Sequence, residues 1–311
     1  MGRTCEGRVA LVTGASRGIG KAIAHRLAAE GASVAICSRP QPGLADLGTL
    51  DLAVSDLQAT GSKIVGIPFD LSDPSNDLSQ LVATVEQELG KIDILVNNAA
   101  AGGFKPFMDW SDSGIEKILQ LNFWVPWKLI REVLPQMRER GEGWIINLSS
   151  ATAIPPVGPP FPPTGPASMG TMYGGSKAFL DRWTASLGVE AGAEGIAVNT
   201  LAPQAAAATE VLLAHSNLPD ELYEPLETMA EAALALATAS PTELTGRITY
   251  SLELLAELQR PTFTLDGTEE LTDWAPATLP ARIAIMKAHS RGEREGQEAS
   301  NVPDLLKTLR D

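Results

Sequence analysis

The chain has 311 residues, a formal net charge of -14 and a hydrophobic content of 44%. This length and composition suit one large α/β domain with extensions, and the negative charge argues against nucleic acid or an anionic membrane as a partner. Because the chain has two cysteines and no apolar run near a membrane span of about 18 residues, we expect a cytoplasmic protein without a disulfide framework.

The first predicted element is a short apolar strand over residues 8–12, followed by a glycine-rich turn and an amphipathic helix that ends at Gly31. Gly14 permits a sharp turn, and Gly18 and Gly20 let a phosphate group approach the backbone. The N–H groups at the start of the helix and the positive end of its dipole suit a pyrophosphate. The turn therefore predicts a nucleotide-binding unit.

Apolar strands alternate with amphipathic helices as far as residue 201. The strands are predicted over residues 33–37, 64–69, 92–96, 144–148 and 196–201, and the helices over residues 76–89, 112–139 and 172–191. This alternation predicts an α/β protein with a doubly wound parallel sheet that helices cover on both faces. Ligands of such sheets bind at the carboxyl ends of the strands.

Two stretches depart from this alternation. Residues 154–166 contain seven prolines, which predicts a stiff, extended loop outside the sheet. The polar tail after Gly267 has a short helical pattern near residues 279–289. We therefore predict a main domain over residues 1–267 and a C-terminal extension over residues 268–311 that packs on the same domain.

Tyr173 and Lys177 are four residues apart, so they share one face of the predicted helix. Of the three tyrosines in the chain, Tyr173 is the one with a cationic residue at this spacing. A tyrosine titrates at about 10, and a nearby ammonium group lowers its pKa by favouring the phenolate. Tyr173 is thus a candidate general acid and base, although such a pair alone is more often an ordinary surface pair.

Other motifs extend this pattern. Ser149 and Ser150 follow the fifth strand, Asn122 lies in the helix before it, and Asn199–Pro203 ends the sixth strand. Together with the glycine turn, the Asn-Asn-Ala motif after the fourth strand and the Tyr-x-x-x-Lys pair, these residues resemble the classical short-chain dehydrogenase/reductase family over about residues 7–267.

The resemblance implies a Rossmann fold and a catalytic set of four residues. Ser150 would hydrogen-bond and polarise a substrate carbonyl, and Tyr173 would deliver or remove the proton. Lys177 would lower the pKa of Tyr173 and hold the nicotinamide ribose, while Asn122 would hold a water that links Lys177 to solvent. Ser150 is preferred to Ser149 because the family's catalytic serine is the second of such a pair.

The cofactor is read from the end of the second strand. Members of the family that prefer NAD carry a carboxylate there, whereas this chain has Ser38 followed by Arg39, and Arg17 lies in the glycine turn. Two guanidinium groups can bind a 2′-phosphate, so we expect NADP(H) as the preferred cofactor and NAD(H) as the alternative. By resemblance, the other cofactor-binding residues are Gly14, Ser16, Gly18, Ile19, Gly20, Asp70, Leu71, Asn98, Ala99, Ala100, Tyr173, Lys177 and Pro203.

Several positions depart from the family's pattern. Ala100 replaces the usual glycine of Asn-Asn-Ala-Gly, and Gln204 replaces the glycine that usually follows Pro203. The threonine that often contacts the nicotinamide carboxamide is displaced by one position to Thr209, with Ala208 in the expected place. These changes concern the approach of the cofactor and the anchoring of its nicotinamide.

The later part of the chain is less regular. We expect the last core strand to end at Asp266–Gly267, after an extra apolar helix near residues 252–258. The proline-rich insert, residues 154–172, lies between the catalytic serine and tyrosine. We expect this insert and the charge-poor segment 205–213 to form two walls of a substrate pocket, which favours a medium to large apolar ketone or alcohol.

The sequence therefore predicts an NADP-preferring oxidoreductase that interconverts a small-molecule ketone and a secondary alcohol by hydride transfer. A 3-oxoacyl-thioester reductase is the alternative within this chemistry, and a non-catalytic NADP(H)-binding sensor is the alternative of another class. Family members pair through two long helices, here residues 112–139 and 172–191, so we expect a homodimer or homotetramer. His25, His215 and His289 lack the spacing of metal ligands, and no metal site is predicted.

Overall fold

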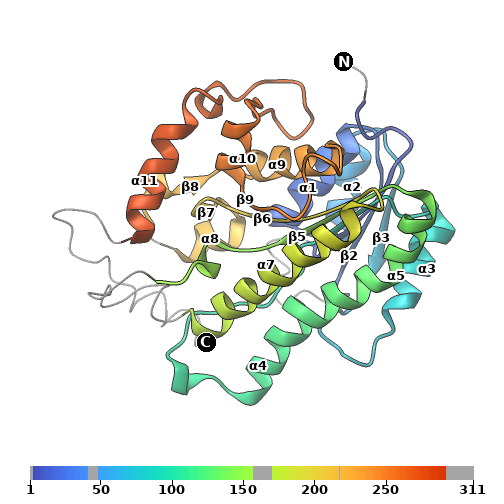
Figure 1. Cartoon of the computed structure of the whole chain (residues 1–311), viewed down its shortest axis with the longest axis horizontal. Coiled ribbons are helices and arrows are strands. Elements are labelled where there is room, and N and C mark those ends of the chain that lie inside the picture. Colours follow the sequence, from blue (N-terminus) through green and yellow to red (C-terminus); the bar gives the residue numbers. More distant parts are fainter. Residues whose placement is uncertain (1–2, 41–47, 157–169, 217, 292–311) are drawn as a thin grey trace.

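The structure is a computed structural model, and it describes residues 3–40, 48–156, 170–216 and 218–291. Six strands lie within two residues of their predicted ranges: β1 (Val9–Thr13), β2 (Ser33–Ser38), β3 (Ile64–Pro68), β4 (Ile94–Asn97), β5 (Gly143–Leu148) and β6 (Ile196–Ala202). A seventh strand, β9 (Ile248–Tyr250), completes a parallel sheet in the order β3-β2-β1-β4-β5-β6-β9 (Figure 1). The predicted doubly wound sheet is confirmed.

Helices cover both faces of this sheet, which is why its central strands read as continuous apolar runs. One face carries α3 (Leu78–Leu89), α5 (Val125–Arg140) and α7 (Thr171–Gly192), and the other carries α1 (Gly18–Ala29), α2 (Leu50–Gln58) and α9 (Leu226–Thr238) (Figure 1). Side chains of one strand alternate between the two layers. Leu11 of β1 packs among α3 and α5, for example, while its neighbours Ala10 and Val12 pack with α1.

The long helix predicted over residues 112–139 is interrupted. It consists of α4 (Asp112–Leu119), a π-helical turn (Gln120–Trp124) and α5, which begins at Val125. Pro126 has no backbone N–H, and it stands in the first turn of α5, where that group is least needed. The wider π turn places Asn122, a predicted site residue, on the buried side.

The prediction for the last core strand was wrong. β9 pairs with β6 and precedes α10 (Ser251–Glu257), whereas Asp266 and Gly267 lie in a turn outside the sheet. In this turn Asp266 Oδ1 accepts hydrogen bonds from the hydroxyls of Thr264 and Thr268, and Gly267 has a φ of +74°. β9 has three residues, which is too short to show the alternation by which strands are predicted.

The chain after β6 builds a second, smaller layer. β7 (Ala206–Ala207) pairs in parallel with β8 (Tyr223–Glu224), and α8 (Glu210–His215) lies between them in the sequence. The helix predicted near residue 279 is observed as α11 (Leu279–Arg291), and its Leu279 and Met286 are buried with α9 and α10. The domain boundary at residue 267 stays a prediction.

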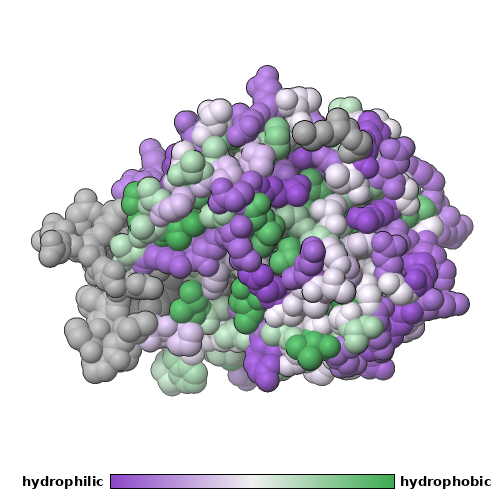
Figure 2. All heavy atoms as spheres, turned by 45° about the horizontal axis from the view of Figure 1, so that its top comes forward, coloured by the Kyte–Doolittle hydropathy of each residue, from purple (hydrophilic) through white to green (hydrophobic). Residues whose placement is uncertain are grey.

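The surface of the protein is mixed. Figure 2 shows a face on which hydrophilic side chains predominate and hydrophobic ones form small groups between them. Within the described ranges, no helix is long and apolar enough to cross a membrane.

Candidate active site

The glycine turn joins β1 to α1, and its tight packing explains its glycines. Gly14 and Gly18 have φ values of +64° and +56°, which favour glycine. A side chain at Gly20 would overlap the amide of Asn98. That amide donates to the carbonyl oxygens of Thr13 and Gly14 at 2.9 and 3.0 Å, so Asn98 holds the turn in place. The glycines themselves place no side chain at the N-terminus of α1, as a phosphate requires, although the side chains of Thr209 and Glu210 approach Gly18 from the segment after β6.

The segment after β4 closes the other side of the turn. The Thr13 hydroxyl accepts from the backbone N–H groups of Asn98 and Ala99, each at 3.0 Å. A Cβ atom on Gly14 would lie 2.9 Å from the Cα atom of Ala99, so the two segments are in direct contact. Ala100 is exposed, and its methyl group therefore fits without disturbing the core.

Two arginines come from adjacent strand ends. Gly14 N donates to Cys37 O at 2.8 Å, which brings the glycine turn beside the end of β2. Ser38 is the buried last residue of β2, and the exposed Arg39 follows it. Arg17, in an extended conformation, precedes the first residue of α1. The predicted 2′-phosphate contacts thus start from neighbouring positions at one edge of the sheet.

Asp70 and Leu71 follow β3. Asp70 Oδ1 accepts from the backbone N–H and the hydroxyl of Ser72, at 2.9 and 2.6 Å. Leu71 is buried, and its carbonyl oxygen accepts from Gln120 Nε2 at 3.3 Å. Asp70 therefore stabilises its own turn. Its contact with an adenine ring stays a prediction, and so does cofactor binding by Ser16 and Ile19.

Asn122 links two segments of the candidate site. Its Oδ1 accepts from Ala101 N, and its Nδ2 donates to Ala101 O and to Ser176 Oγ, all at 2.9 Å. The Ser176 hydroxyl in turn donates to Tyr173 O at 2.7 Å. Because π turns often mark functional positions, this arrangement agrees with a site role for Asn122. In the structure, Asn122 connects the loop after β4 to α7 through these hydrogen bonds.

Ser150 and Tyr173 meet at the end of β5. Ser150 Oγ accepts from Thr152 N at 3.2 Å and from the Thr152 hydroxyl at 2.9 Å, and it lies close enough to the Tyr173 side chain to act on the pKa of that residue. Phe104 packs edge-on against the Tyr173 ring, with a centroid distance of 6.1 Å. The Tyr173 side chain is partly exposed, but protein atoms surround its hydroxyl, and this burial raises its pKa while Ser150 acts in the opposite direction.

Lys177 is buried one turn further along α7. Its Nζ donates to Leu148 O at 2.6 Å and lies 5.9 Å from the centre of the Tyr173 ring. Burial lowers the pKa of Lys177 to about 8, and the charge of Asp181 opposes this shift. The expected lowering of the Tyr173 pKa by Lys177 is not seen here, because the ammonium bonds to the Leu148 carbonyl and burial dominates at the tyrosine.

The segment after β6 is held by a buried carboxylate that the sequence analysis missed. Glu224 accepts from Gln204 N at 2.5 Å, from the Thr228 hydroxyl at 2.6 Å and from the Ser251 hydroxyl at 2.5 Å. Its pKa is raised to about 7, chiefly by burial. Gln204, which replaces the family's glycine after Pro203, is thus fixed by a residue 20 positions later, and no sequence pattern marks this contact.

Thr209 and Asp181 are two further residues at the site. Thr209 begins α8, where its hydroxyl accepts from Leu212 N at 3.2 Å, and its methyl group lies beside Gly18 of the glycine turn. Asp181 is buried on α7, four residues after Lys177. The sequence contained a signal for Asp181. It follows Lys177 by four residues, just as Lys177 follows Tyr173 by four residues.

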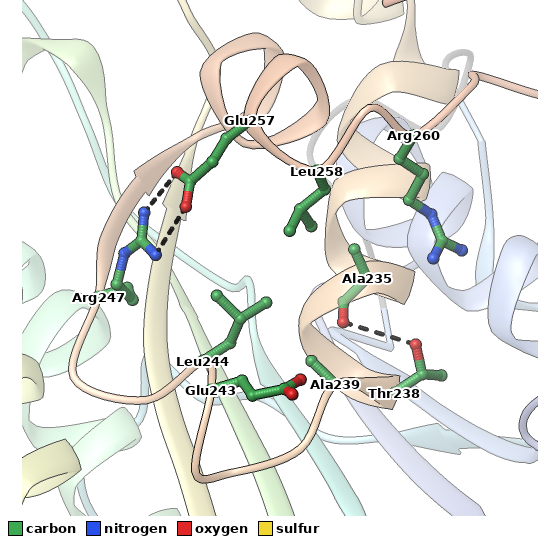
Figure 3. Close-up of a pocket in the computed structure, with 9 residues that line it drawn as sticks. All are labelled: Ala235, Thr238, Ala239, Glu243, Leu244, Arg247, Glu257, Leu258 and Arg260. Atoms are coloured by element: carbon green, nitrogen blue, oxygen red, sulfur yellow. Dashed lines mark hydrogen bonds and ion pairs between the residues drawn. The ribbon is translucent and has the colours of Figure 1, made fainter.

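A cavity of about 630 Å³ lies away from these residues. It is lined by residues of α9, of α10 and of the loop before β9, and Leu244 and Leu258 project into it (Figure 3). Arg247 and Glu257 form an ion pair at its side, at 2.6 Å. Because Arg247 precedes β9, this cavity is at the opposite end of the sheet from the candidate site. Of the two predicted pocket walls, the proline-rich insert over residues 154–172 lies mostly outside the described residues, which exclude residues 157–169.

Comparison with known proteins agrees with this geometry. A model of the short chain dehydrogenase family matches residues 8–217. The chain belongs to this family. Among its relatives, the ketoacyl reductase HetN of Nostoc sp. is 35% identical over 200 residues, which are 64% of each chain. A rhamnolipids biosynthesis 3-oxoacyl-[acyl-carrier-protein] reductase of Pseudomonas aeruginosa is 33% identical over 256 residues, covering 78% of this chain and 93% of that protein.

Solved short-chain dehydrogenase structures share the fold. A 3-oxoacyl (acyl-carrier-protein) reductase from Agrobacterium tumefaciens, with NADP bound, superposes with a TM-score of 0.66 at 26% identity, covering 80% of this chain and 94% of that one. The chain spans 64%, 59% and 65% of the length of the first three curated relatives that it matches. Activity and substrate are therefore matters of proposal.

Proposed function

We propose that the protein is an NADP-preferring oxidoreductase that interconverts a ketone and a secondary alcohol. The observation that carries the proposal is the meeting of Ser150, Tyr173 and Lys177 at the end of β5, on the same edge of the sheet as the glycine turn. The serine hydroxyl lies close enough to the tyrosine to act on its pKa, and the lysine ammonium is buried 5.9 Å from the centre of the tyrosine ring. A proton donor, a polarising hydroxyl and a fixed positive charge are what carbonyl reduction needs.

The residues fit a nicotinamide cofactor. The N–H groups at the N-terminus of α1 would bind a pyrophosphate once the Glu210 side chain, which approaches Gly18, moves aside. Arg17 and Arg39 would bind a 2′-phosphate, and Lys177 would hold the nicotinamide ribose. When bound, the cofactor supplies or accepts the hydride. The NADP present in the Agrobacterium structure supports this choice of nucleotide.

Side chains of the protein itself would carry out the proton transfer and stabilise the charge on the substrate oxygen. In the reducing direction, the Ser150 hydroxyl would donate a hydrogen bond to the carbonyl oxygen and stabilise the charge that develops there. The Tyr173 hydroxyl would give that oxygen its proton. Burial alone makes the phenolate costly, so the Ser150 hydrogen bond and the Lys177 charge would offset this cost during the transfer.

A 3-oxoacyl thioester is the second candidate substrate, because two of the relatives are named as 3-oxoacyl-carrier-protein reductases. The small apolar side chains of residues 205–208 favour instead a medium to large apolar ketone or alcohol. We propose that the latter class is preferred. A turnover screen of apolar ketones, secondary alcohols and 3-oxoacyl thioesters, each with NADPH or NADH and their oxidised forms, tests this.

The outcomes of this screen are distinct. Faster turnover of apolar ketones with NADPH supports the proposal, and faster turnover of thioesters replaces its substrate class. Binding of NADPH without turnover of any substrate would favour the non-catalytic sensor.

We also propose a homodimer or homotetramer that forms through α4, α5 and α7. Trp124 and Phe179 are 43% and 52% exposed, and Phe123 contacts both rings at centroid distances of 4.7 and 5.1 Å. An exposed aromatic group of this kind suits an interface between copies. Sedimentation of the unmodified chain and of Phe179→Glu tests it: a species larger than 32.8 kDa that the substitution dissociates is expected.

A further inference from the structure

A third ionisable side chain is buried on the face of α7 that carries the candidate catalytic pair. Lys177 is 3% exposed and Asp181 is 7% exposed, and the same buried face continues through Thr184 and Gly188. Residues four apart on a helix are neighbours. The acid and the ammonium group thus lie one turn apart in a part of the protein from which water is largely excluded.

The surroundings of Asp181 are polar without being basic. Burial raises the pKa of Asp181, and the hydroxyls of Ser149, after β5, and Thr200, in β6, oppose this shift, as does the charge of Lys177 to a smaller extent. Asp181 Oδ1 has no hydrogen-bond partner within the described part of the chain. The Lys177 ammonium bonds to Leu148 O and forms no direct ion pair with Asp181 among the described residues, so the two charges interact across a longer gap. Neutral hydroxyls alone would leave a buried carboxylate poorly compensated, and Lys177 is the cation one helical turn away.

The titratable groups around this pair come from several elements. On α7, Tyr173 lies beside Lys177. At the end of β9, the pKa of Tyr250 is raised chiefly by burial, and the charges of Asp181 and of Glu253 on α10 act in the same direction. β5 and β6 contribute hydroxyls and the Leu148 carbonyl. Over the residues that the structure describes, Asp181 is the charged side chain that favours the cationic form of Lys177.

We infer that Asp181 is the buried counter-ion of Lys177 and that it keeps this lysine cationic at the candidate active site. Asp181 is thus a positioning residue that acts through Lys177. The catalytic consequence rests on the proposed function, since Lys177 serves proton transfer only if Tyr173 is the acid and base. The charge coupling between the two side chains can be measured without substrate or cofactor.

The sign of the effect follows from the charges. Removing the carboxylate removes the interaction that favours the ammonium form, so the pKa of Lys177 falls below its present value of about 8. An opposite charge within about 4 to 6 Å shifts a pKa by about one unit or more, and a shift of about one unit is taken for this pair. At pH 8 the cationic fraction of Lys177 would then fall about fivefold, and the alkaline limb of any activity that needs the cation would move to lower pH by the same amount.

The first experiment measures the pKa of Lys177 by NMR of lysine labelled with ¹³C at Cε, with the signal assigned by its loss in Lys177→Met. Asp181→Asn should lower this pKa by about one unit, and Asp181→Glu should restore it. Glu190→Gln is the matched control, because Glu190 is an exposed carboxylate on the same helix. An unchanged pKa of Lys177 in Asp181→Asn would overturn the inference.

A reciprocal measurement guards against a variant that does not fold. If the two charges are coupled, Lys177→Met must raise the pKa of the Asp181 carboxyl, which ¹³C NMR of labelled aspartate reports. An Asp181 carboxyl that titrates identically with and without the lysine would contradict the coupling, whatever the fate of Asp181→Asn.

The second experiment links the pair to activity. The pH profiles of NADPH affinity and of turnover should shift to lower pH in Asp181→Asn, and Asp181→Asn should have no further effect on either profile in a Lys177→Met background. A shift that persists in that background would show that Asp181 does not act through Lys177. Coupled pKa values in a protein that turns over no substrate would leave the inference standing and would refute the proposed function.

Discussion

The glycine turn and the segment after β6 are two polar regions at the same edge of the sheet, and they are built differently. In the glycine turn, contacts run between short segments, and Thr13 and Asn98 hold the backbone by neutral hydrogen bonds. After β6, the buried carboxylate of Glu224 gathers donors from Gln204, Thr228 and Ser251. The glycine turn can be recognised in the sequence as a local motif. The segment after β6 depends on contacts between distant residues, which no sequence pattern predicts.

A buried ion-pair network ties the two regions together. Arg26 of α1 donates to Glu231 of α9 at 2.8 Å, and Arg260 donates to the same carboxylate at 2.7 Å. Since α1 starts at the glycine turn and α9 follows β8, the pair joins the early and the late parts of the chain. The two regions therefore predict different consequences of mutation: loss of chemistry or cofactor selectivity on the motif side, and loss of stability on the side of the buried carboxylates.

The largest expected effect concerns Tyr173. Tyr173→Phe should lower turnover about a thousandfold, since a positioned general acid contributes on the order of 100- to 10,000-fold. Cofactor affinity, by fluorescence titration, and the free energy of unfolding should change little, because phenylalanine keeps the ring and its contact with Phe104 and loses only the hydroxyl that Ser150 approaches. Substantial residual turnover in this variant would remove Tyr173 from the role of acid and base.

The next effect is on stability and concerns Glu231. Glu231→Gln removes the buried carboxylate shared by Arg26 and Arg260, while Arg26 keeps its second partner, Glu30, at 2.7 Å. The free energy of unfolding in urea should therefore fall by about 3 kcal/mol, the lower end of the cost of breaking a buried ion pair. Glu257→Gln is the matched control, because Glu257 also pairs with an arginine but is exposed, and its loss should change stability by less than about 1 kcal/mol. Equal effects of the two substitutions would show that burial does not distinguish these pairs.

The sequence predicted what short-range patterns determine. Apolar runs located β1 to β6, and the spacing of Gly14, Gly18 and Gly20 located the start of α1. The strand β9 was not predicted, because its three residues are too few to show a periodic pattern. The Asp266–Gly267 turn was wrongly predicted to be the end of a strand.

The candidate site divides in the same way. The sequence placed Tyr173 and Lys177 on one helix, and the structure brings Ser150 to them. The partners of Asn122 and Glu224 depend on a π turn and on the return of the chain after β8, which no local pattern records. The direction of the Tyr173 pKa was also beyond the sequence, because it depends on burial.

Glu224 should give the fold a pH dependence. Its pKa is raised from 4.5 to about 7, so between these values the folded protein retains a proton that the unfolded chain has released. The folded state then binds more protons, and stability falls as pH rises from about 4.5 to about 7. Urea unfolding between about pH 5 and pH 7.5 should show a decline on the order of 1 to 3 kcal/mol.

A substitution isolates this term. Glu224→Gln is neutral throughout, so the decline should be smaller than in the unmodified chain, and Glu190→Gln, which removes an exposed carboxylate, serves as the control. The window stops below the pKa of Lys177, which is about 8, so that its titration contributes little. The same slope with and without Glu224 would mean that the carboxyl titrates elsewhere.

The smallest effect is expected for Arg39, which is exposed at the end of β2. A guanidinium on a 2′-phosphate at the protein surface contributes about 1 to 2 kcal/mol, so Arg39→Ala should weaken NADPH binding about tenfold. NADH lacks this phosphate, and its affinity should stay within about twofold. Arg17→Ala should weaken NADPH in the same direction, because the two arginines start from adjacent strand ends.

Lys63→Ala is the control for the loss of a positive charge, since Lys63 precedes β3 at the other end of the sheet and bonds to Glu88 O. If Arg39→Ala and Lys63→Ala lower the affinity for NADPH equally, the effect comes from long-range electrostatic attraction, and Arg39 does not bind the 2′-phosphate directly. If the unmodified chain binds NADPH and NADH with equal affinity, the preference for NADP(H) itself is refuted. Selectivity that is lost only with Arg17 or Arg39 would locate the choice of nucleotide at the junction of β1, β2 and α1, where the sequence motif placed it.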